Sequence, residues 1–203
     1  MRFCLLLALL GAALAAEPLS KGERDQAMSH LHATRKQVLD VLQSVSDAQW
    51  TYKPGPTRWS IAECAEHIAE TEVMLRGLVQ RNAKTLPLDE AKRTQHATAK
   101  DAAAKAVLTQ MTDRSKPASA PQEVRPTGRF ASRSALISAF SSRRDETIHY
   151  VESTQDDLRG RFFSMGPDRE MDLYEMILMI SGHAERHLLQ MKEVMATAGY
   201  PKK

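Results

Sequence analysis

Apolar residues recur at helical spacing in four long stretches of the chain. In the first stretch, Leu31, Val38, Leu42 and Val45 follow one another at intervals of seven, four and three residues among polar side chains. Such spacing places the apolar side chains on one face of an amphipathic helix. Similar patterns predict helices over residues 20–44, 61–82, 132–154 and 168–198, and a thinner apolar stripe predicts a surface helix over 89–111.

The breaks between these stretches set the order of the elements. Residues 51–57 hold two prolines and a glycine, which predict a loop. Ser60 and Glu63 have the spacing of a capping box, so the second helix is expected to begin at Ile61. Residues 115–128 contain three prolines and predict a long irregular connection. Four principal helices, with one long crossover segment after the second, favour an all-α, antiparallel four-helix bundle.

The first 16 residues have the composition of an export signal. An arginine at position 2 precedes an apolar run over residues 3–16, which is shorter than the about 20 residues of a membrane-spanning helix. Residues 13–15, Ala-Leu-Ala, have the A-x-A pattern of a cleavage site. We therefore expect a secretory signal peptide over 1–15 and one domain over 16–203, exported to the periplasm or the extracellular space without a stable membrane anchor. An uncleaved anchor is the alternative.

Composition and charge narrow the class of protein further. The chain has 28 Lys and Arg against 25 Asp and Glu, mixed along its length, so the sequence predicts no nucleic-acid partner. Aromatic residues make up 5% of the chain, and good helix formers are plentiful, which favours helix over sheet. After signal cleavage Cys64 is the one remaining cysteine, so no disulfide can form within the mature chain.

Three histidines carry the candidate chemistry. His183 and His187 stand four residues apart on the helical face of Met176 and Ile180, so both imidazoles are expected to point into the bundle. Two imidazoles at this spacing can bind one metal ion, but two hydrogen-bonded core histidines fit the pattern equally well. His67 lies on the inward face of the second helix and offers a third nitrogen. Three ligands from two helices leave positions open for water or substrate, as catalytic metal sites do.

Two segments of the sequence resemble the DinB-like superfamily. Residues 59–63, Trp-Ser-Ile-Ala-Glu, followed by His67, are similar to the family's W-S-x-x-E helix start, and residues 182–190 are similar to its late H-x-x-x-H-x-x-Q motif. The resemblance implies a four-helix bundle of up-down-down-up topology with a three-histidine site for a divalent metal. It implies that His67, His183 and His187 are the ligands. Family members include thiol-dependent S-transferases and isomerases, and many have no assigned reaction.

Several other side chains have both a functional and a structural interpretation. Arg144 falls on the inward face of its helix, where it either binds an anionic substrate or pairs with a carboxylate. Gln190 either donates to a ligand or substrate or is satisfied between helices. Simpler roles are expected for the remaining candidates: helix capping for Glu63, a core thiol for Cys64, loop packing for Trp59, an outward position for His149, and surface positions for His30, His32 and His96.

The leading hypothesis is an exported DinB-like protein that holds Zn²⁺, Ni²⁺ or Fe²⁺ and acts on a small molecule. The metal would serve as a Lewis acid in a metal-dependent hydrolase or a thiol-dependent transferase. Export favours hydrolysis, because the small thiols used by characterised relatives are cytosolic. The alternatives are a non-catalytic bundle that binds a metal or small ligand, and a structural bundle with three hydrogen-bonded histidines. The oligomeric state stays open between a monomer and a homodimer paired through its helices.

Overall fold

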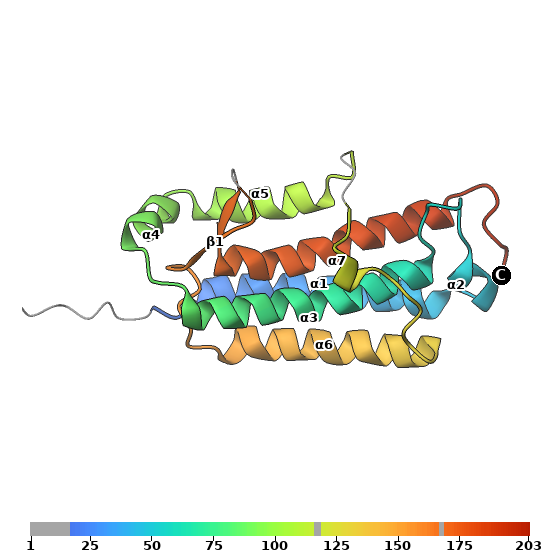
Figure 1. Ribbon diagram of the computed structural model, residues 1–203, viewed down its shortest axis with the longest axis horizontal. Coiled ribbons are helices and arrows are strands. Elements are labelled where there is room, and N and C mark those ends of the chain that lie inside the picture. The colour runs from blue at the N-terminus through green and yellow to red at the C-terminus, as the bar shows by residue number, and fades with distance from the viewer. Residues whose placement is uncertain (1–16, 116–118, 167–168) are drawn as a thin grey trace, which may run out of the picture.

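A computed structural model describes residues 17–115, 119–166 and 169–203 of the chain. Four long helices form the bundle: α1 (Lys21–Ser44), α3 (Ile61–Thr85), α6 (Arg133–Ser153) and α7 (Leu173–Met195). When the colours in Figure 1 are followed from blue to red, α1 and α7 run in one direction and α3 and α6 in the other. The predicted all-α bundle of up-down-down-up topology is therefore confirmed. The predicted signal peptide lies outside the described residues.

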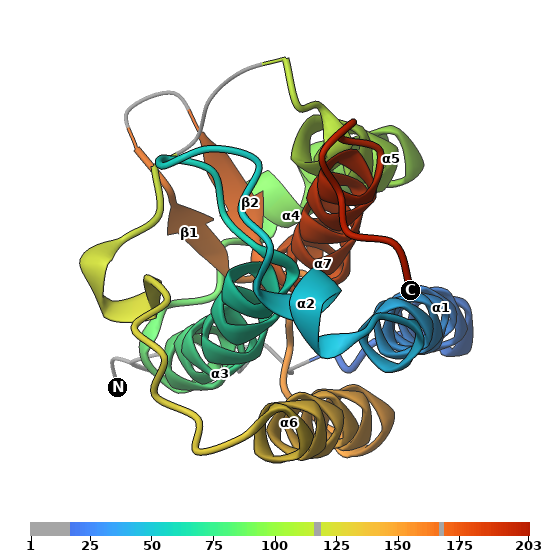
Figure 2. The same ribbon diagram turned by 90° about the vertical axis from the view of Figure 1, so that its right-hand side faces the viewer.

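The end-on view in Figure 2 shows the four helices at the corners of a square. Helix α7 packs beside α1 and α3, and α6 packs beside the same two helices on the opposite side. Helices α1 and α3 therefore stand on a diagonal although they are the first and second long helices of the bundle along the chain. This arrangement makes α3 and α7 neighbours, which the three predicted metal ligands require.

The segment that crosses from α3 to α6 is more ordered than the sequence predicts. It contains α4 (Glu90–Ala97), α5 (Lys100–Thr112) and a short 3₁₀ helix, η1 (Gln122–Val124). Helix α5 lies along the outer side of α7 in Figures 1 and 2, with Ala104 and Val107 buried. The prediction of one surface helix over 89–111 is wrong, because the helix is divided at Thr98 and its second half is packed against the bundle.

Two small elements lie outside the sequence prediction. A one-turn helix, α2 (Asp47–Thr51), follows α1 and is capped by Ser46. Strands β1 (Phe162–Ser164) and β2 (Glu170–Asp172) pair antiparallel, with Phe162 opposite Asp172. The hairpin leads directly into α7, which consequently begins at Leu173 rather than near residue 168.

Side-chain caps explain where the bundle helices begin. Ser60 accepts a hydrogen bond from the Glu63 amide, and the Glu63 carboxylate accepts one from the Ser60 amide. This confirms the predicted capping box and the start of α3 at Ile61. Ser20 and Glu23 form the same motif before α1, and Asp172 and Glu175 form it before α7. Each motif satisfies two amides that would otherwise lack a partner inside the helix.

A layer of buried polar side chains crosses the middle of the bundle. Arg144 of α6 donates to both carboxylate oxygens of Glu72 on α3, at 2.8 and 2.7 Å, and to the Thr34 hydroxyl of α1 at 2.7 Å. The Thr34 hydroxyl in turn lies 3.1 Å from that of Ser181 on α7. Apolar clusters lie on both sides of this layer, one including Leu31, Leu75, Ile148 and Ile177 and the other including Leu42, Ile68, Phe140 and Leu188. The layer thus links all four helices just before His183.

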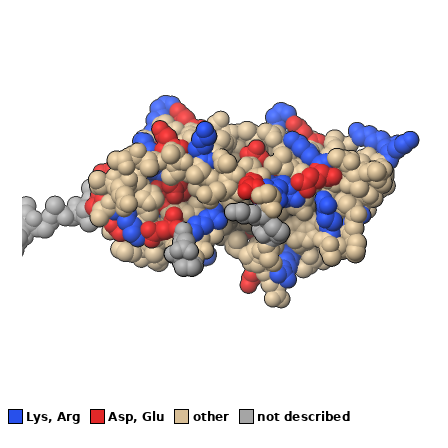
Figure 3. Space-filling model, turned by 90° about the horizontal axis from the view of Figure 1, so that it is seen from above, with Lys and Arg blue, Asp and Glu red and all other residues tan. Residues whose placement is uncertain are grey.

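The surface mixes charges of both signs. On the face that carries α5, Figure 3 shows blue basic and red acidic side chains interspersed. No helix within the described ranges combines the length and the apolar character that crossing a membrane requires.

Candidate metal centre

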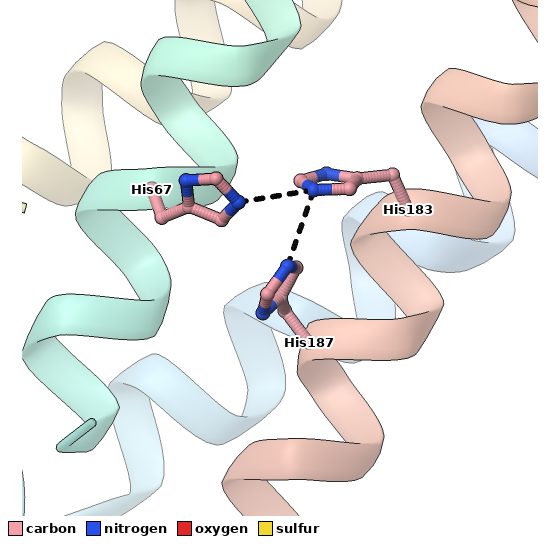
Figure 4. Close-up of side chains that lie close together, drawn as sticks. All are labelled: His67, His183 and His187. Carbon is pink, nitrogen blue, oxygen red and sulfur yellow. Dashed lines mark hydrogen bonds between the residues drawn. The ribbon is translucent and has the colours of Figure 1, made fainter. Parts of the chain in front are cut away.

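The three predicted histidines meet between α3 and α7. Because α3 and α7 pack together, His67 faces His183 and His187, which lie one turn apart on α7 (Figure 4). The Nε2 atom of His183 lies 3.1 Å from Nε2 of His67 and 3.1 Å from Nε2 of His187. His67 and His187 are 4% and 7% exposed, and His183 is partly exposed. The fold therefore brings His67 to two histidines that follow it by 116 and 120 residues in the sequence. All three rings meet through their Nε2 atoms.

Hydrogen bonds hold the Nδ1 atoms of His67 and His187, on the side of each ring that faces away from the cluster. Nδ1 of His67 lies 2.7 Å from the carbonyl oxygen of Val124, at the end of η1. Because a carbonyl oxygen can only accept, Nδ1 of His67 carries the proton and Nε2 has a free lone pair. Nδ1 of His187 lies 2.8 Å from Oε1 of Gln190, which gives His187 the same tautomer with the amide oriented as in the structure.

The surroundings of the cluster keep its rings neutral at physiological pH. Burial lowers the pKa of His67, and the hydrogen bond to Val124 offsets only part of this shift. Burial and the proximity of His67 lower the pKa of His187 to about 3. Desolvation, His187 and His67 lower the pKa of His183 well below its usual value. Neutral imidazole is the form that binds a metal ion.

The donor set fits a cation. Because His67 and His187 both present unprotonated Nε2 atoms, His183 can donate its single Nε2 proton to only one of them at a time. At least one of the two 3.1 Å contacts therefore joins two lone pairs. Nitrogen ligands at 2.0–2.1 Å from a shared ion stand about 2.8–3.0 Å apart at octahedral angles and about 3.3–3.4 Å apart at tetrahedral angles. The two spacings of 3.1 Å lie between these values, and all three ligand atoms lie within 4.8 Å of one another.

Trp59 and the crossover segment enclose the histidines. The Trp59 ring centroid lies 4.9 Å from that of His67 and 5.8 Å from that of His187, with the second pair stacked. Glu66, the residue directly before His67 on α3, accepts hydrogen bonds from the amides of Thr127 and Gly128 at 2.8 and 2.9 Å. These contacts fasten the crossover segment to α3 and so position the carbonyl of Val124 over His67.

Arg144 and Gln190 differ in their relation to the cluster. Gln190 contacts His187, but through Oε1, which accepts from Nδ1 of His187 and orients the ring rather than donating to it. Arg144 is fully buried, and its guanidinium is bonded to Glu72, to Thr34 and to the carbonyl of Leu31. The structure favours the interpretation of Arg144 as the partner of a carboxylate. Substrate binding by either residue stays a prediction.

The remaining candidates have structural surroundings. Glu63 caps α3 and also pairs with Lys53 at 2.8 Å, and Cys64 is a buried free thiol whose pKa is raised by burial. His149 and His32 are exposed, as expected. His96 was expected at the surface, and its side chain is 29% exposed. Its Nδ1 atom also lies 3.8 Å from Oε1 of the buried Glu175. The two residues are 79 positions apart, so ligand spacing along the sequence could not relate them.

The sequence did not predict that the carbonyl of Val124 orients His67. It predicted loop packing for Trp59, whose ring in the structure also lies against His67 and His187. A backbone carbonyl leaves no trace in residue type, so no local signal could have identified Val124. The position of Trp59 eight residues before His67, within the same resembling motif, was a signal that the ring belongs near the histidines.

Comparison with known proteins agrees with this fold. A family model described as the DinB superfamily matches residues 30–191. The chain is 23% identical over 167 residues to the uncharacterized protein YuaE of Bacillus subtilis strain 168, covering 82% of this chain and 96% of YuaE. Among solved structures it is similar to YfiT from Bacillus subtilis, described as a probable metal-dependent hydrolase with an unusual four-helix bundle topology. The TM-score is 0.58 at 14% identity, with 95% of this chain and 97% of YfiT covered.

Proposed function

The chain belongs to the DinB superfamily, and we propose that it is an exported metal-dependent hydrolase whose divalent ion is held by Nε2 of His67, His183 and His187. The observation that carries the proposal is the convergence of three neutral imidazoles whose Nε2 atoms approach to 3.1 Å. The description of YfiT as a probable metal-dependent hydrolase supports the same reaction class. Zn²⁺, Ni²⁺ and Fe²⁺ all suit three imidazole ligands.

The ion would supply Lewis-acid chemistry, by polarising an oxygen of the substrate or by lowering the pKa of a water molecule. The residues of this chain prepare the site for that role. Val124 and Gln190 fix the tautomers of His67 and His187, so that both lone pairs point to one position. Trp59 covers the imidazoles from one side and limits the access of water to them.

Two arginines lie near the cluster, and both have carboxylate neighbours. Arg186 and Arg114 lie close enough to His187 to lower its pKa further. Arg114 itself forms a two-point contact with Glu193, at 2.6 and 2.8 Å. These ion pairs balance the charge of the arginines, so the substrate proposed here is a small molecule of no particular charge.

Export and the domain limits complete the proposal. We infer a signal peptide over residues 1–15, on the short apolar run and the A-x-A pattern, and a mature domain over 16–203. An exported site would lack the cytosolic thiols that a thiol-dependent transferase consumes, which favours water as the nucleophile.

The experiment is a screen of the mature protein, loaded in turn with Zn²⁺, Ni²⁺ and Fe²⁺, against small esters, amides and phosphoesters. A parallel arm offers a small thiol together with an electrophile. Hydrolysis that is lost in a folded His67→Ala variant and retained in His149→Ala supports the proposal. Thiol conjugation without hydrolysis would replace it with the transferase, and bound metal without turnover of any substrate would leave a binding protein.

A further inference from the structure

A second group of metal-ligating side chains lies at the other end of α7. His96 of α4, together with Asp172 and Glu175 at the start of α7, brings a ring nitrogen and two carboxylates within 4.8 Å of one another. Glu175 precedes His183 by eight residues, which is about 12 Å along a helix axis. The group is therefore separate from the three-histidine cluster.

The fold places these side chains through two independent contacts. Asp172 ends β2 and caps α7, with its Oδ1 atom accepting from the Glu175 amide at 2.8 Å. Oδ2 of Asp172 accepts from Arg159 at 2.7 Å. Each carboxylate oxygen has two lone pairs, so capping and ion pairing leave Asp172 capacity for one more partner on each oxygen.

Glu175 supplies the observation that points to a ligand. The residue is 3% exposed, and among the residues that the structure describes its buried Oε1 atom has no hydrogen-bond partner. Its other oxygen accepts from the Asp172 amide, at 3.2 Å. Within the described residues no lysine or arginine forms an ion pair with Glu175, and the approaching group is Nδ1 of His96 at 3.8 Å. A buried carboxylate oxygen without a partner carries a desolvation cost that a cation would remove.

His96 closes the group on the solvent side. Its ring packs edge-on against Phe162, with 4.8 Å between centroids, and its side chain is 29% exposed. Solvent can therefore reach the ring although both carboxylates are buried. The spacing of 3.8 Å between Nδ1 and Oε1 exceeds the about 3.4 Å of two ligands on one tetrahedral ion by only a few tenths of an ångström.

We propose that His96, Asp172 and Glu175 form a second binding site, for a divalent transition-metal ion that fastens α4 to the start of α7. One imidazole and two carboxylates suit Zn²⁺ or Mn²⁺ better than Ca²⁺ or Mg²⁺, which prefer oxygen ligands throughout. The ion would balance the buried charge of Glu175 and hold the crossover segment against the bundle. Its role is structural and does not depend on the reaction of the histidine cluster.

The test counts zinc in the untagged mature protein after chelator treatment, reloading with Zn²⁺ and dialysis. The wild type is expected to retain two equivalents, and His67→Ala and His96→Ala one each. His149→Ala, which removes an exposed histidine, should retain two. Glu175→Gln adds a second probe, because glutamine also serves in a capping box and keeps the start of α7 intact. It should lower the affinity of the site that survives in His67→Ala by at least about 10-fold.

Each result decides between the two sites. Zinc content that is the same in His96→Ala and Glu175→Gln as in the wild type overturns the second site. A single equivalent that disappears in His67→Ala overturns it as well and leaves the histidine cluster intact. A single equivalent that disappears only in His96→Ala supports the second site and counts against the proposed function.

Discussion

Nδ1 of His67 lies 2.7 Å from the carbonyl oxygen of Val124, so a candidate ligand on α3 is oriented by the segment that crosses between α3 and α6. The contact fixes the proton of His67 on Nδ1 and directs the lone pair of Nε2 toward α7. The crossover segment is therefore part of the site, and changes that loosen it are expected to weaken metal binding.

Glu66 is the residue that fastens this segment. Burial alone would raise its pKa, but hydrogen bonds from the amides of Thr127, Gly128 and Arg129 outweigh burial and lower the pKa below its usual value. A lowered native pKa gives stability that is present above the unfolded value of about 4.3 and is lost as the pH falls below it. We expect Glu66→Gln to lower the free energy of unfolding at pH 7 by about 1–3 kcal/mol.

The measurement for Glu66 is urea unfolding of both proteins at pH 7 and pH 3. The difference between wild type and Glu66→Gln should shrink at the lower pH, where the native carboxylate begins to be protonated. Metal affinity at pH 7 should fall in the same variant through the displaced carbonyl of Val124. A stability difference that grows on acidification would contradict this account.

Gln190 is expected to tune the site through His187. Removal of its side-chain acceptor in Gln190→Leu frees the imidazole to adopt the other tautomer and to turn away from the ion. The expected cost is about 10- to 100-fold in metal affinity, as for other residues that orient a ligand. Gln190→Glu keeps an acceptor oxygen at the same position and should retain the affinity, which competition with a chelating dye can measure for both. Equal affinities in Gln190→Leu and wild type would show that Gln190 does not orient His187.

The buried pair of Arg144 and Glu72 makes a strong stability prediction. Glu72→Ala leaves an arginine that is 0% exposed without its carboxylate, and breaking such a pair costs about 3–5 kcal/mol. Replacing both residues, as in Glu72→Leu with Arg144→Met, should recover most of that loss because no buried charge remains. Lys36→Ala, which breaks the exposed pair with Asp40, should cost less than about 1 kcal/mol. Thermal unfolding of the wild type and the three variants checks the order, and a double variant as unstable as Glu72→Ala would contradict it.

Gly182 permits the close approach of α5 to α7. A Cβ atom there would lie 2.9 Å from Cβ of Met111. Because Cβ of Met111 is attached directly to the backbone of α5, rotation of the Met111 side chain cannot relieve this clash. Although alanine is the better helix former, Gly182→Ala is expected to destabilise the protein by about 1–3 kcal/mol through overpacking. Gly22→Ala, where nothing lies within 4 Å, is the control and should be neutral or stabilising. A rise in melting temperature for Gly182→Ala would contradict the tight packing of α5.

The sequence could predict the helices because their signals are local. The capping box of Ser60 and Glu63 and the apolar spacing of Leu31, Val38 and Leu42 each lie within a few turns, and the structure has helices at those positions. It could not predict the docking of α5, because the thin stripe of Val107, Leu108 and Met111 is typical of a surface helix until Gly182 is brought beside it. The spacing of apolar residues indicates which face of a helix is buried, but it does not indicate which element packs against that face.

The same distinction holds for the candidate site. His183 and His187 are recognisable as a pair from their spacing of four, and the inward face of the second helix added His67 as a third nitrogen donor. The family resemblance then implied that all three are ligands. The hydrogen bond from His67 to Val124 joins residues 57 positions apart, and the approach of His96 to Glu175 depends on the path of α4. Contacts of this kind depend on the tertiary fold, so no pattern within one helix could predict them.

The most direct test of the account is the metal content of the untagged mature protein beside that of a variant with His67→Ala, His183→Ala and His187→Ala. We expect the variant to stay folded, by its helical circular dichroism, and to contain one equivalent of divalent metal less than the wild type. Equal metal contents in two folded proteins, after supplementation with Zn²⁺, Ni²⁺ and Fe²⁺, would contradict it and leave the three histidines as hydrogen-bonded residues of the core.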